Sequence, residues 1–199
     1  KQATIAGQIL LNGIDISTLS DGDWRQLRGT EISMIFQNPS AYLNPNRTVE
    51  NHFKDLFRAH GESYDASRII DMLDLVHLDG GDRILQSYPF QLSGGMQQRL
   101  AIALSLILKP NIVFADEPTS ALDILVQASV LDLLREVTQA LGATVVIVTH
   151  NIKAAARIAN SIGVMNKGQL VEVGPTEAVI NQPKAEYTHV LLDSVMKVV

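Results

Sequence analysis

The sequence predicts an α/β fold with a mainly parallel β-sheet and an inserted lobe of α-helices. Short apolar segments with strand character alternate with amphipathic segments of helical period, as in sheets whose strands are joined by helices. By contrast, residues 49–108 show little strand character. We therefore expect a single domain over residues 1–199, in which a helical lobe at about 49–108 is inserted into a core formed by residues 1–48 and 109–199.

Strands are predicted where a short apolar run ends at turn residues. These runs are residues 3–11, 31–36, 111–115, 143–148, 161–165 and 169–173. Asn12–Gly13 predicts a turn after the first run, which we interpret as an edge strand. Asn166–Lys167–Gly168 predicts a hairpin between the last two runs. The β-branched run 143–148 is typical of a strand that is buried on both faces.

Helices are predicted where apolar residues recur every three or four positions. Within the lobe, Ile69, Leu73 and Val76 follow this spacing. Residues 124–141 are amphipathic and end at Gly142, a residue suited to the position after a helix. Residues 151–159 and the chain from residue 185 onward are also predicted to be helical.

Composition excludes several classes of protein. Of the 199 residues, 46% are hydrophobic and 19% are charged, which is ordinary for a globular domain. The longest apolar run, 100–108, is too short to span a bilayer. Sixteen Lys and Arg against 21 Asp and Glu argue against a broad basic face, so we expect no nucleic-acid partner. The absence of cysteine excludes disulfides and thiolate metal sites.

Two acidic residues, Asp116 and Glu117, end the predicted strand 111–115. In open parallel sheets this end of a strand faces the ligand crevice. Because neighbouring side chains on a strand point to opposite sides, the two carboxylates can serve different roles. Asp116 suits Mg²⁺ bound through its water shell, and Glu117 suits polarisation of an attacking water. The alternative, a strand that ends in a solvated acidic turn, is equally compatible with these two residues alone.

A pair of glycines precedes an apolar helix. Ser93 is a natural N-cap, and Gly94 and Gly95 allow backbone N–H groups to approach an anion. The helix dipole adds positive potential, so the segment predicts a phosphate site. The commoner meaning of such a segment is a capped helix that binds nothing. The run Gln97–Gln98–Arg99 is unusual for mere capping and favours the phosphate site.

Two further polar residues follow predicted strands. His150 comes after strand 143–148, and its ring can hydrogen-bond a phosphoryl oxygen or a water molecule. Gln37 follows strand 31–36, and its amide can bind Mg²⁺ through oxygen or position a water molecule. Taken singly, residues of these kinds are more often structural.

These features occur in one order along the chain, and together they closely resemble the nucleotide-binding subunit of ABC transporters. Residues 92–99 resemble the signature motif, 112–117 resemble Walker B with the catalytic glutamate, and 120–123 resemble the D-loop. Gln37 is similar to the Q-loop glutamine and His150 to the switch histidine.

The resemblance implies a P-loop NTPase (RecA-like) core that uses ATP and Mg²⁺. It implies catalytic roles for Glu117, His150 and Gln37, and metal binding by Asp116 and Gln37. In this family two subunits enclose ATP between them, and the signature of one faces the nucleotide held by the other. The nucleotide contacts implied in this way are Ser93, Gly94, Gly95, Met96, Gln97 and Asp123.

Further segments are similar to the oligopeptide, dipeptide and nickel importer branch of that family. They are residues 28–39, 43–45, 88–89 and 95–99, and the tail residues Pro183, Tyr187–Thr188 and Leu191–Leu192. The resemblance implies a peripheral ATPase subunit on the cytoplasmic face of the membrane that energises import of a peptide or of a nickel or other metal chelate. Its implied partners are permease subunits, a second identical or different ATPase subunit and, indirectly, an extracytoplasmic solute-binding protein.

The sequence departs from the family at two points. The Walker A loop, Gly-x-x-x-x-Gly-Lys-Ser/Thr, is not among the 199 residues, nor is the upstream aromatic residue that stacks on adenine. Because that loop holds the phosphates, we interpret the chain as the later part of a longer ATPase and expect it to bind ATP poorly and to be inactive alone. Asn151 stands where the family usually has Asp.

Two alternatives remain. One is a soluble ABC ATPase outside transport, and the tail around Pro183 and Tyr187 speaks against it. The other is a catalytically silent module whose intact partner hydrolyses ATP. The intact Asp116, Glu117 and His150 speak against that second alternative.

Overall fold

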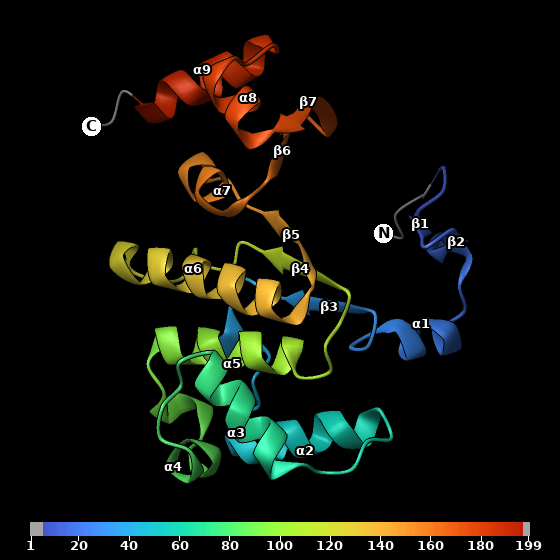
Figure 1. Cartoon of the computed structure of the whole chain (residues 1–199), viewed down its shortest axis with the longest axis vertical. Helices are drawn as coiled ribbons and strands as arrows, with labels where there is room; N and C mark the ends of the chain where they lie inside the picture. The colour runs from blue at the N-terminus through green and yellow to red at the C-terminus, as the bar shows by residue number, and fades with distance from the viewer. Residues whose placement is uncertain (1–5, 197–199) are drawn as a thin grey trace.

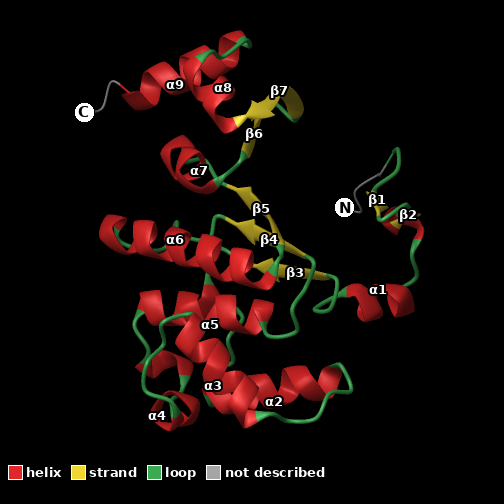
Figure 2. Cartoon of the chain, in the orientation of Figure 1, coloured by secondary structure: helices red, strands yellow, loops and turns green. Residues whose placement is uncertain are grey.

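A three-stranded parallel sheet of order β3–β4–β5 forms the centre of the computed structural model, which describes residues 6–196 apart from the side chains of residues 124, 125, 195 and 196. The strands are β3 (Ile32–Ile35), β4 (Ile112–Asp116) and β5 (Thr144–Val148) (Figure 2). This confirms the predicted parallel sheet and its three strands. Because parallel strands run the same way, the residues that follow them gather at one edge.

Two helices cover one face of this sheet, namely α5 (Gly94–Leu106) and α6 (Ile124–Leu141) (Figure 1). Val113 and Ala115 of β4 are buried in the core cluster that these helices share with the sheet. The predicted helix 124–141 is confirmed, and Gly142 ends it in the left-handed conformation at φ 70°.

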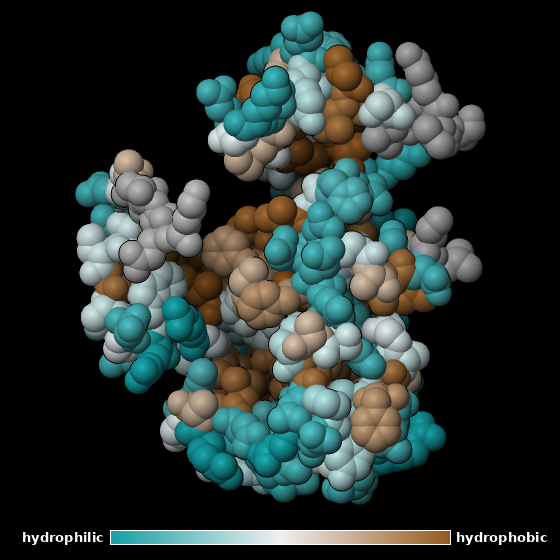
Figure 3. Space-filling model, turned by 180° about the vertical axis from the view of Figure 1, so that it is seen from behind, coloured by the Kyte–Doolittle hydropathy of each residue, from teal (hydrophilic) through white to brown (hydrophobic). Residues whose placement is uncertain are grey.

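The opposite face of the sheet is exposed in the described chain. Phe114 is 39% exposed, Val146 42% and Val148 59%, and Figure 3 shows apolar surface in the middle of the molecule. The prediction that strand 143–148 is buried on both faces is therefore wrong here. β-branched residues favour strands packed against apolar neighbours, which is why the composition suggested burial on both faces. The described helices pack against one face of the sheet only.

The helical lobe consists of α2 (Val49–Ala59), α3 (Ala66–Leu75) and α4 (Asp82–Gln86), which pack beneath α5 (Figure 1). Buried Phe53, Phe57 and Leu73 form its interior. No strand occurs within residues 49–108, all of which the structure describes, so their helical character is confirmed. Helix α5 also contacts the sheet, since Ser105 Oγ donates to the carbonyl of Met34 at 3.2 Å. The boundaries of the lobe stay a prediction.

A short hairpin precedes the sheet. Its strands are β1 (Leu10–Leu11) and β2 (Ile14–Asp15), and positive φ at both Asn12 and Gly13 is typical of a two-residue hairpin turn. The turn is confirmed. Of the predicted strand 3–11, only the last two residues form a strand, because the partner strand is equally short. Residues 3–5 lie outside the described part.

Helix α1 (Asp21–Leu27) was not predicted, although the capping box of Ser20 and Asp23 signals it.

After the sheet the chain forms a smaller unit with its own apolar cluster of Ile162, Val164 and Val179. It comprises α7 (Ile152–Ile158), β6 (Ser161–Asn166), β7 (Gln169–Pro175), α8 (Thr176–Asn181) and α9 (Glu186–Met196). The predicted helix 151–159 and the predicted hairpin are confirmed. The predicted helix from residue 185 onward is confirmed as far as Met196, and residues 197–199 lie outside the described part. Helix α8 was not predicted. None of the described helices combines the length and apolarity needed to cross a membrane.

An ion pair joins α7 to α6, and its contribution to stability is expected to depend on pH. Arg157 Nε donates to Asp132 Oδ1 at 2.8 Å, and Arg157 Nη2 donates to Asp132 Oδ2 at 2.5 Å. These hydrogen bonds hold the pKa of Asp132 below its ordinary value of 3.8. The stabilisation is therefore present above pH 3.8 and is lost as the pH falls through the lowered pKa.

We expect Asp132→Asn to increase amide hydrogen exchange in α7 at pH 7, and this difference from the unmodified protein to vanish well below pH 3.8. Glu136→Gln, which removes an exposed carboxylate from the same helix, is the control and should leave α7 unchanged. A difference between Asp132→Asn and the unmodified protein that persists at low pH would contradict the assignment.

Candidate functional site

Three predicted site residues meet at the edge where the strands end. Glu117, directly after β4, accepts a hydrogen bond at Oε2 from Gln37 Nε2 at 3.2 Å. Its other oxygen, Oε1, lies 2.9 Å from His150 Nδ1. Gln37 is 80 positions away in sequence and His150 is 33, so the parallel sheet brings the three residues together.

The backbone of Glu117 is strained. Its φ is 42°, in the left-handed region that non-glycine residues rarely adopt. Its N–H donates to the carbonyl of Val148 at 2.8 Å, and its carbonyl accepts from Ser120 N at 3.2 Å and Ser120 Oγ at 3.1 Å. These bonds offset a conformational cost of about 1–3 kcal/mol. Strain that the surroundings maintain in this way is typical of functional positions.

The hydrogen bond between Nδ1 and Glu117 also orients the imidazole of His150. A carboxylate only accepts hydrogen bonds, so Nδ1 carries the proton that it shares with Glu117, and Nε2 is left to meet a ligand. The side chain of His150 is 76% exposed, whereas that of Glu117 is 26% exposed. The histidine is therefore open to an approaching group, and the glutamate is the more sheltered partner.

A hollow of about 90 Å³ lies beside Glu117 and His150. Its other lining residues are Thr119, Ser120, Gln127, Thr149 and Asn151. The volume is large enough for a few water molecules and far below the roughly 300 Å³ of a small-ligand pocket. Thr119 and Gln127 were not singled out from the sequence, and their only signal is proximity to the predicted motifs. Thr149 precedes His150 in one of these motifs, but no role was predicted for it.

Asn151 links His150 to the helix that follows. Its Oδ1 accepts from the N–H of Ala154 at 3.2 Å, so Asn151 is the N-cap of α7. Its own N–H donates to Thr149 Oγ1 at 3.0 Å. Asn and Asp cap helices about equally well, so the difference from the family's usual Asp leaves this local role intact.

We expect Asn151→Asp to leave the free energy of unfolding nearly unchanged, and Asn151→Ala to lower it by about 1 kcal/mol through loss of the cap. Chemical denaturation of the two variants measures the difference. Equal stabilities for the Ala and Asp variants would mean that the cap contributes nothing.

The start of α5 has the features of an anion site. Ser93 Oγ accepts from the N–H of Met96 at 3.3 Å, which confirms Ser93 as N-cap, and the carbonyl of Ser93 accepts from the N–H of Gln97 at 2.9 Å. The N–H groups of Gly94 and Gly95 have no acceptor within residues 6–196. Two backbone donors therefore stay available at the positive end of the helix.

The side chains of Met96 and Gln97 are engaged within the chain. Gln97 Nε2 donates to the carbonyls of Pro89 at 2.9 Å and Leu92 at 3.2 Å, and it thereby fixes the loop before α5. Met96 packs against the core. In the described chain no hydrogen bond joins the start of α5 to Glu117. The predicted nucleotide contacts at the start of α5 are therefore separate from the group formed by Gln37, Glu117 and His150.

The carboxylates of the two remaining predicted residues form no hydrogen bond or ion pair within the part of the chain that the structure describes. Asp123 occupies the N-cap position of α6 without a capping bond from its side chain and is exposed. Asp116 ends β4 half-buried. Among the described residues, no three or more His, Cys, Asp or Glu side chains gather as a metal cage. A lone carboxylate fits Mg²⁺, which is often bound by one or two carboxylates together with water and phosphates.

Comparison with known proteins identifies the family. The model of the ABC transporter family matches residues 1–120. The dipeptide transport ATP-binding protein DppD of Bacillus subtilis is 42% identical over 193 residues, which are 95% of this chain and 57% of that protein. The oligopeptide transport ATP-binding protein OppD of Lactococcus lactis is 37% identical over 196 residues, or 97% of this chain and 58% of that protein. The chain thus spans less than two thirds of the length of these relatives.

Solved structures agree with the sequence relatives. The ATP-binding cassette MJ0796, in a dimeric post-hydrolysis state bound to ADP and Pi, matches with a TM-score of 0.72 and 30% identity. The match covers 86% of this chain and 74% of that one. The α/β core with its parallel sheet is therefore that of an ATP-binding cassette, and the chain belongs to the ABC transporter family.

Proposed function

We propose that this protein is the ATP-hydrolysing subunit of a membrane importer for peptides. The observation that carries the proposal is the bridge from Gln37 through Glu117 to His150 at the edge of the sheet. The relatives reported above are named for dipeptide and oligopeptide transport. Their names favour a peptide over the nickel or metal chelate that the sequence left open.

In the proposed reaction the chain mainly positions groups and stabilises charge around the transferred phosphoryl group. Glu117 orients an attacking water in the adjacent hollow and accepts its proton. When both ring nitrogens of His150 carry protons, Nε2 donates to an oxygen of the terminal phosphate. Gln37 holds the glutamate carboxylate in place. The N–H groups of Gly94 and Gly95 bind phosphate oxygens of the nucleotide held by a second subunit, and Asp123 reaches toward that subunit.

The proposed metal is Mg²⁺, held through water by Asp116, with the amide oxygen of Gln37 as a second ligand. When bound, it supplies positive charge that stabilises the phosphate oxygens. Gln37 can serve both tasks, because its Nε2 donates to Glu117 whereas its Oε1 has no hydrogen bond among the described residues.

The proposed partners follow from the same role. A second ATPase subunit, identical or different, completes the nucleotide sites. Permease subunits receive the motion of the helical lobe, and an extracytoplasmic solute-binding protein delivers the solute to them. The subunit itself is peripheral to the cytoplasmic face of the membrane.

The test uses cells that lack the gene. We expect the full-length gene to restore uptake of a labelled dipeptide, and the purified complex with its permease to hydrolyse ATP. Nickel uptake is measured in parallel. Restored nickel uptake without peptide uptake would identify the other solute, and ATP hydrolysis without any effect on uptake would favour an ATPase outside transport. A complex that hydrolyses ATP equally well when Glu117 of this subunit is changed would favour the silent module.

A further inference from the structure

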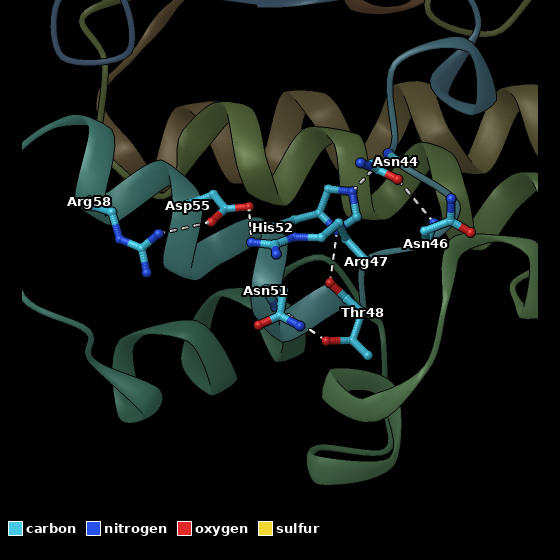
Figure 4. A network of polar contacts seen from close by, with 8 residues as sticks. All are labelled: Asn44, Asn46, Arg47, Thr48, Asn51, His52, Asp55 and Arg58. Carbon is cyan, nitrogen blue, oxygen red and sulfur yellow. Dashed lines mark hydrogen bonds and ion pairs between the residues drawn. The ribbon is translucent and has the colours of Figure 1, made fainter.

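We propose that His52 is a positioning residue that holds Gln37 on Glu117 by fixing the connecting segment 37–48 to helix α2. The inference rests on the proposed function of Gln37 and Glu117. Both ring nitrogens of His52 bind the backbone of that segment (Figure 4). Nε2 lies 3.0 Å from the N–H of Asn44, and Nδ1 lies 2.8 Å from the carbonyl oxygen of Thr48.

The two backbone partners determine the tautomer of His52. The N–H of Asn44 can only donate, so Nε2 must present its lone pair. The carbonyl of Thr48 can only accept, so Nδ1 must carry the proton. A neutral ring with its proton on Nδ1 thus clamps both ends of the turn 44–48 to the helix that follows it.

Short-range hydrogen bonds span residues 38–43, which lie between Gln37 and this turn. Asn38 Oδ1 accepts from Ser40 N at 3.2 Å and Ser40 Oγ at 2.7 Å. The N–H of Leu43 donates to the carbonyl of Pro39 at 3.0 Å, and the side chains of Pro39 and Leu43 are buried. Residues 38–43 therefore form a stiff connection, and a displacement of Asn44 is carried to Gln37.

The far end of the connection is sensitive to such a displacement. The bond from Gln37 Nε2 to Glu117 Oε2 is 3.2 Å long, at the upper end of the normal range. A shift of a few tenths of an ångström therefore weakens it. The two His52 bonds therefore determine the strength of the hydrogen bond between Gln37 and Glu117. Because His52 lies on α2, that strength depends on the position of the helical lobe.

A second tie, which serves as a control, lies near His52. Arg47 pairs with Asp55 of α2, and Arg58 Nη1 is 3.6 Å from Asp55 Oδ1. The side chains of Arg47 and Asp55 are 40% and 45% exposed, so this pair contributes little to stability. Asp55→Asn therefore removes the charge from a neighbouring ion pair of the same loop while leaving both His52 bonds in place.

The experiment compares variants of the full-length protein in its transporter complex. For His52→Ala we expect the maximal rate of ATP hydrolysis to fall about fivefold with the KM for ATP unchanged. His52→Gln retains an oxygen that can accept from the N–H of Asn44, and it should recover most of the rate. Asp55→Asn should change the rate less than twofold. NMR of ¹⁵N-labelled histidine should show the proton of His52 on Nδ1, and the side-chain amide signal of Gln37 should move in His52→Ala.

Four results would overturn the proposal: a proton on Nε2 of His52, an unmoved Gln37 amide signal in His52→Ala, an unchanged maximal rate in His52→Ala, or a Gln variant as slow as the Ala variant. Failure of the proposed function is distinguishable. If the unmodified complex does not hydrolyse ATP, the NMR measurements still decide whether His52 positions Gln37.

Discussion

Glu117→Gln in the full-length protein is expected to abolish steady-state ATP hydrolysis while nucleotide-dependent dimerisation is retained. The carboxylate is the group beside the hollow that can take a proton from water, and a neutral amide cannot do so. Loss of a general base commonly lowers the rate by about 10²–10⁴-fold. The amide is nearly isosteric and its one oxygen can still accept from Gln37 or from His150, so one of the two contacts is kept. We therefore expect the dimer still to close on ATP.

The matched control is Glu136→Gln on α6, an exposed carboxylate outside the site. It should leave both hydrolysis and dimerisation unchanged. Hydrolysis is measured by phosphate release, and dimerisation by size-exclusion chromatography with and without ATP. Near-normal turnover of Glu117→Gln would refute the role assigned to this residue.

Gly95→Ala is expected to lower hydrolysis at least about tenfold and also to destabilise the fold. An added Cβ would lie 3.0 Å from Val126 Cγ1 of α6, which is too close for an ordinary contact. A β-branched residue on a helix has little freedom to rotate away, so we expect an overpacking cost of about 1 kcal/mol. We also expect a side chain at this position to hinder the approach of a phosphate to the backbone N–H groups.

Gly94→Ala separates these two effects. Its Cβ would meet Leu122 Cδ2 at 3.6 Å, an ordinary van der Waals distance. We therefore expect this variant to keep its melting temperature but to lose hydrolysis. The double variant Gly95→Ala, Val126→Ala should recover stability without recovering full activity. Complete recovery of activity in the double variant would mean that Gly95 serves packing alone and contributes nothing to anion binding.

Local pattern was sufficient for most of the secondary structure, and it was the basis on which the candidate site residues were chosen. Apolar periodicity and turn residues identified the three sheet strands, and Gly142 marked the end of α6, because these signals act over a few neighbouring residues. They also explain the omissions. Helices α1 and α8 are short, with six or seven residues, and such segments carry little periodicity.

The tertiary structure alone decided which of these residues meet and what each contacts. In the folded chain Gln37 hydrogen-bonds to Glu117, which is 80 positions away in sequence. The side-chain amide of Gln97 donates to the loop before α5, and one face of β5 is exposed. The order of strands in the sheet and the side on which helices pack determine these outcomes, and both depend on contacts between residues distant in sequence. The amino-acid sequence thus determined the chemistry that this protein carries, and the parallel arrangement of β3, β4 and β5 determined where that chemistry is assembled.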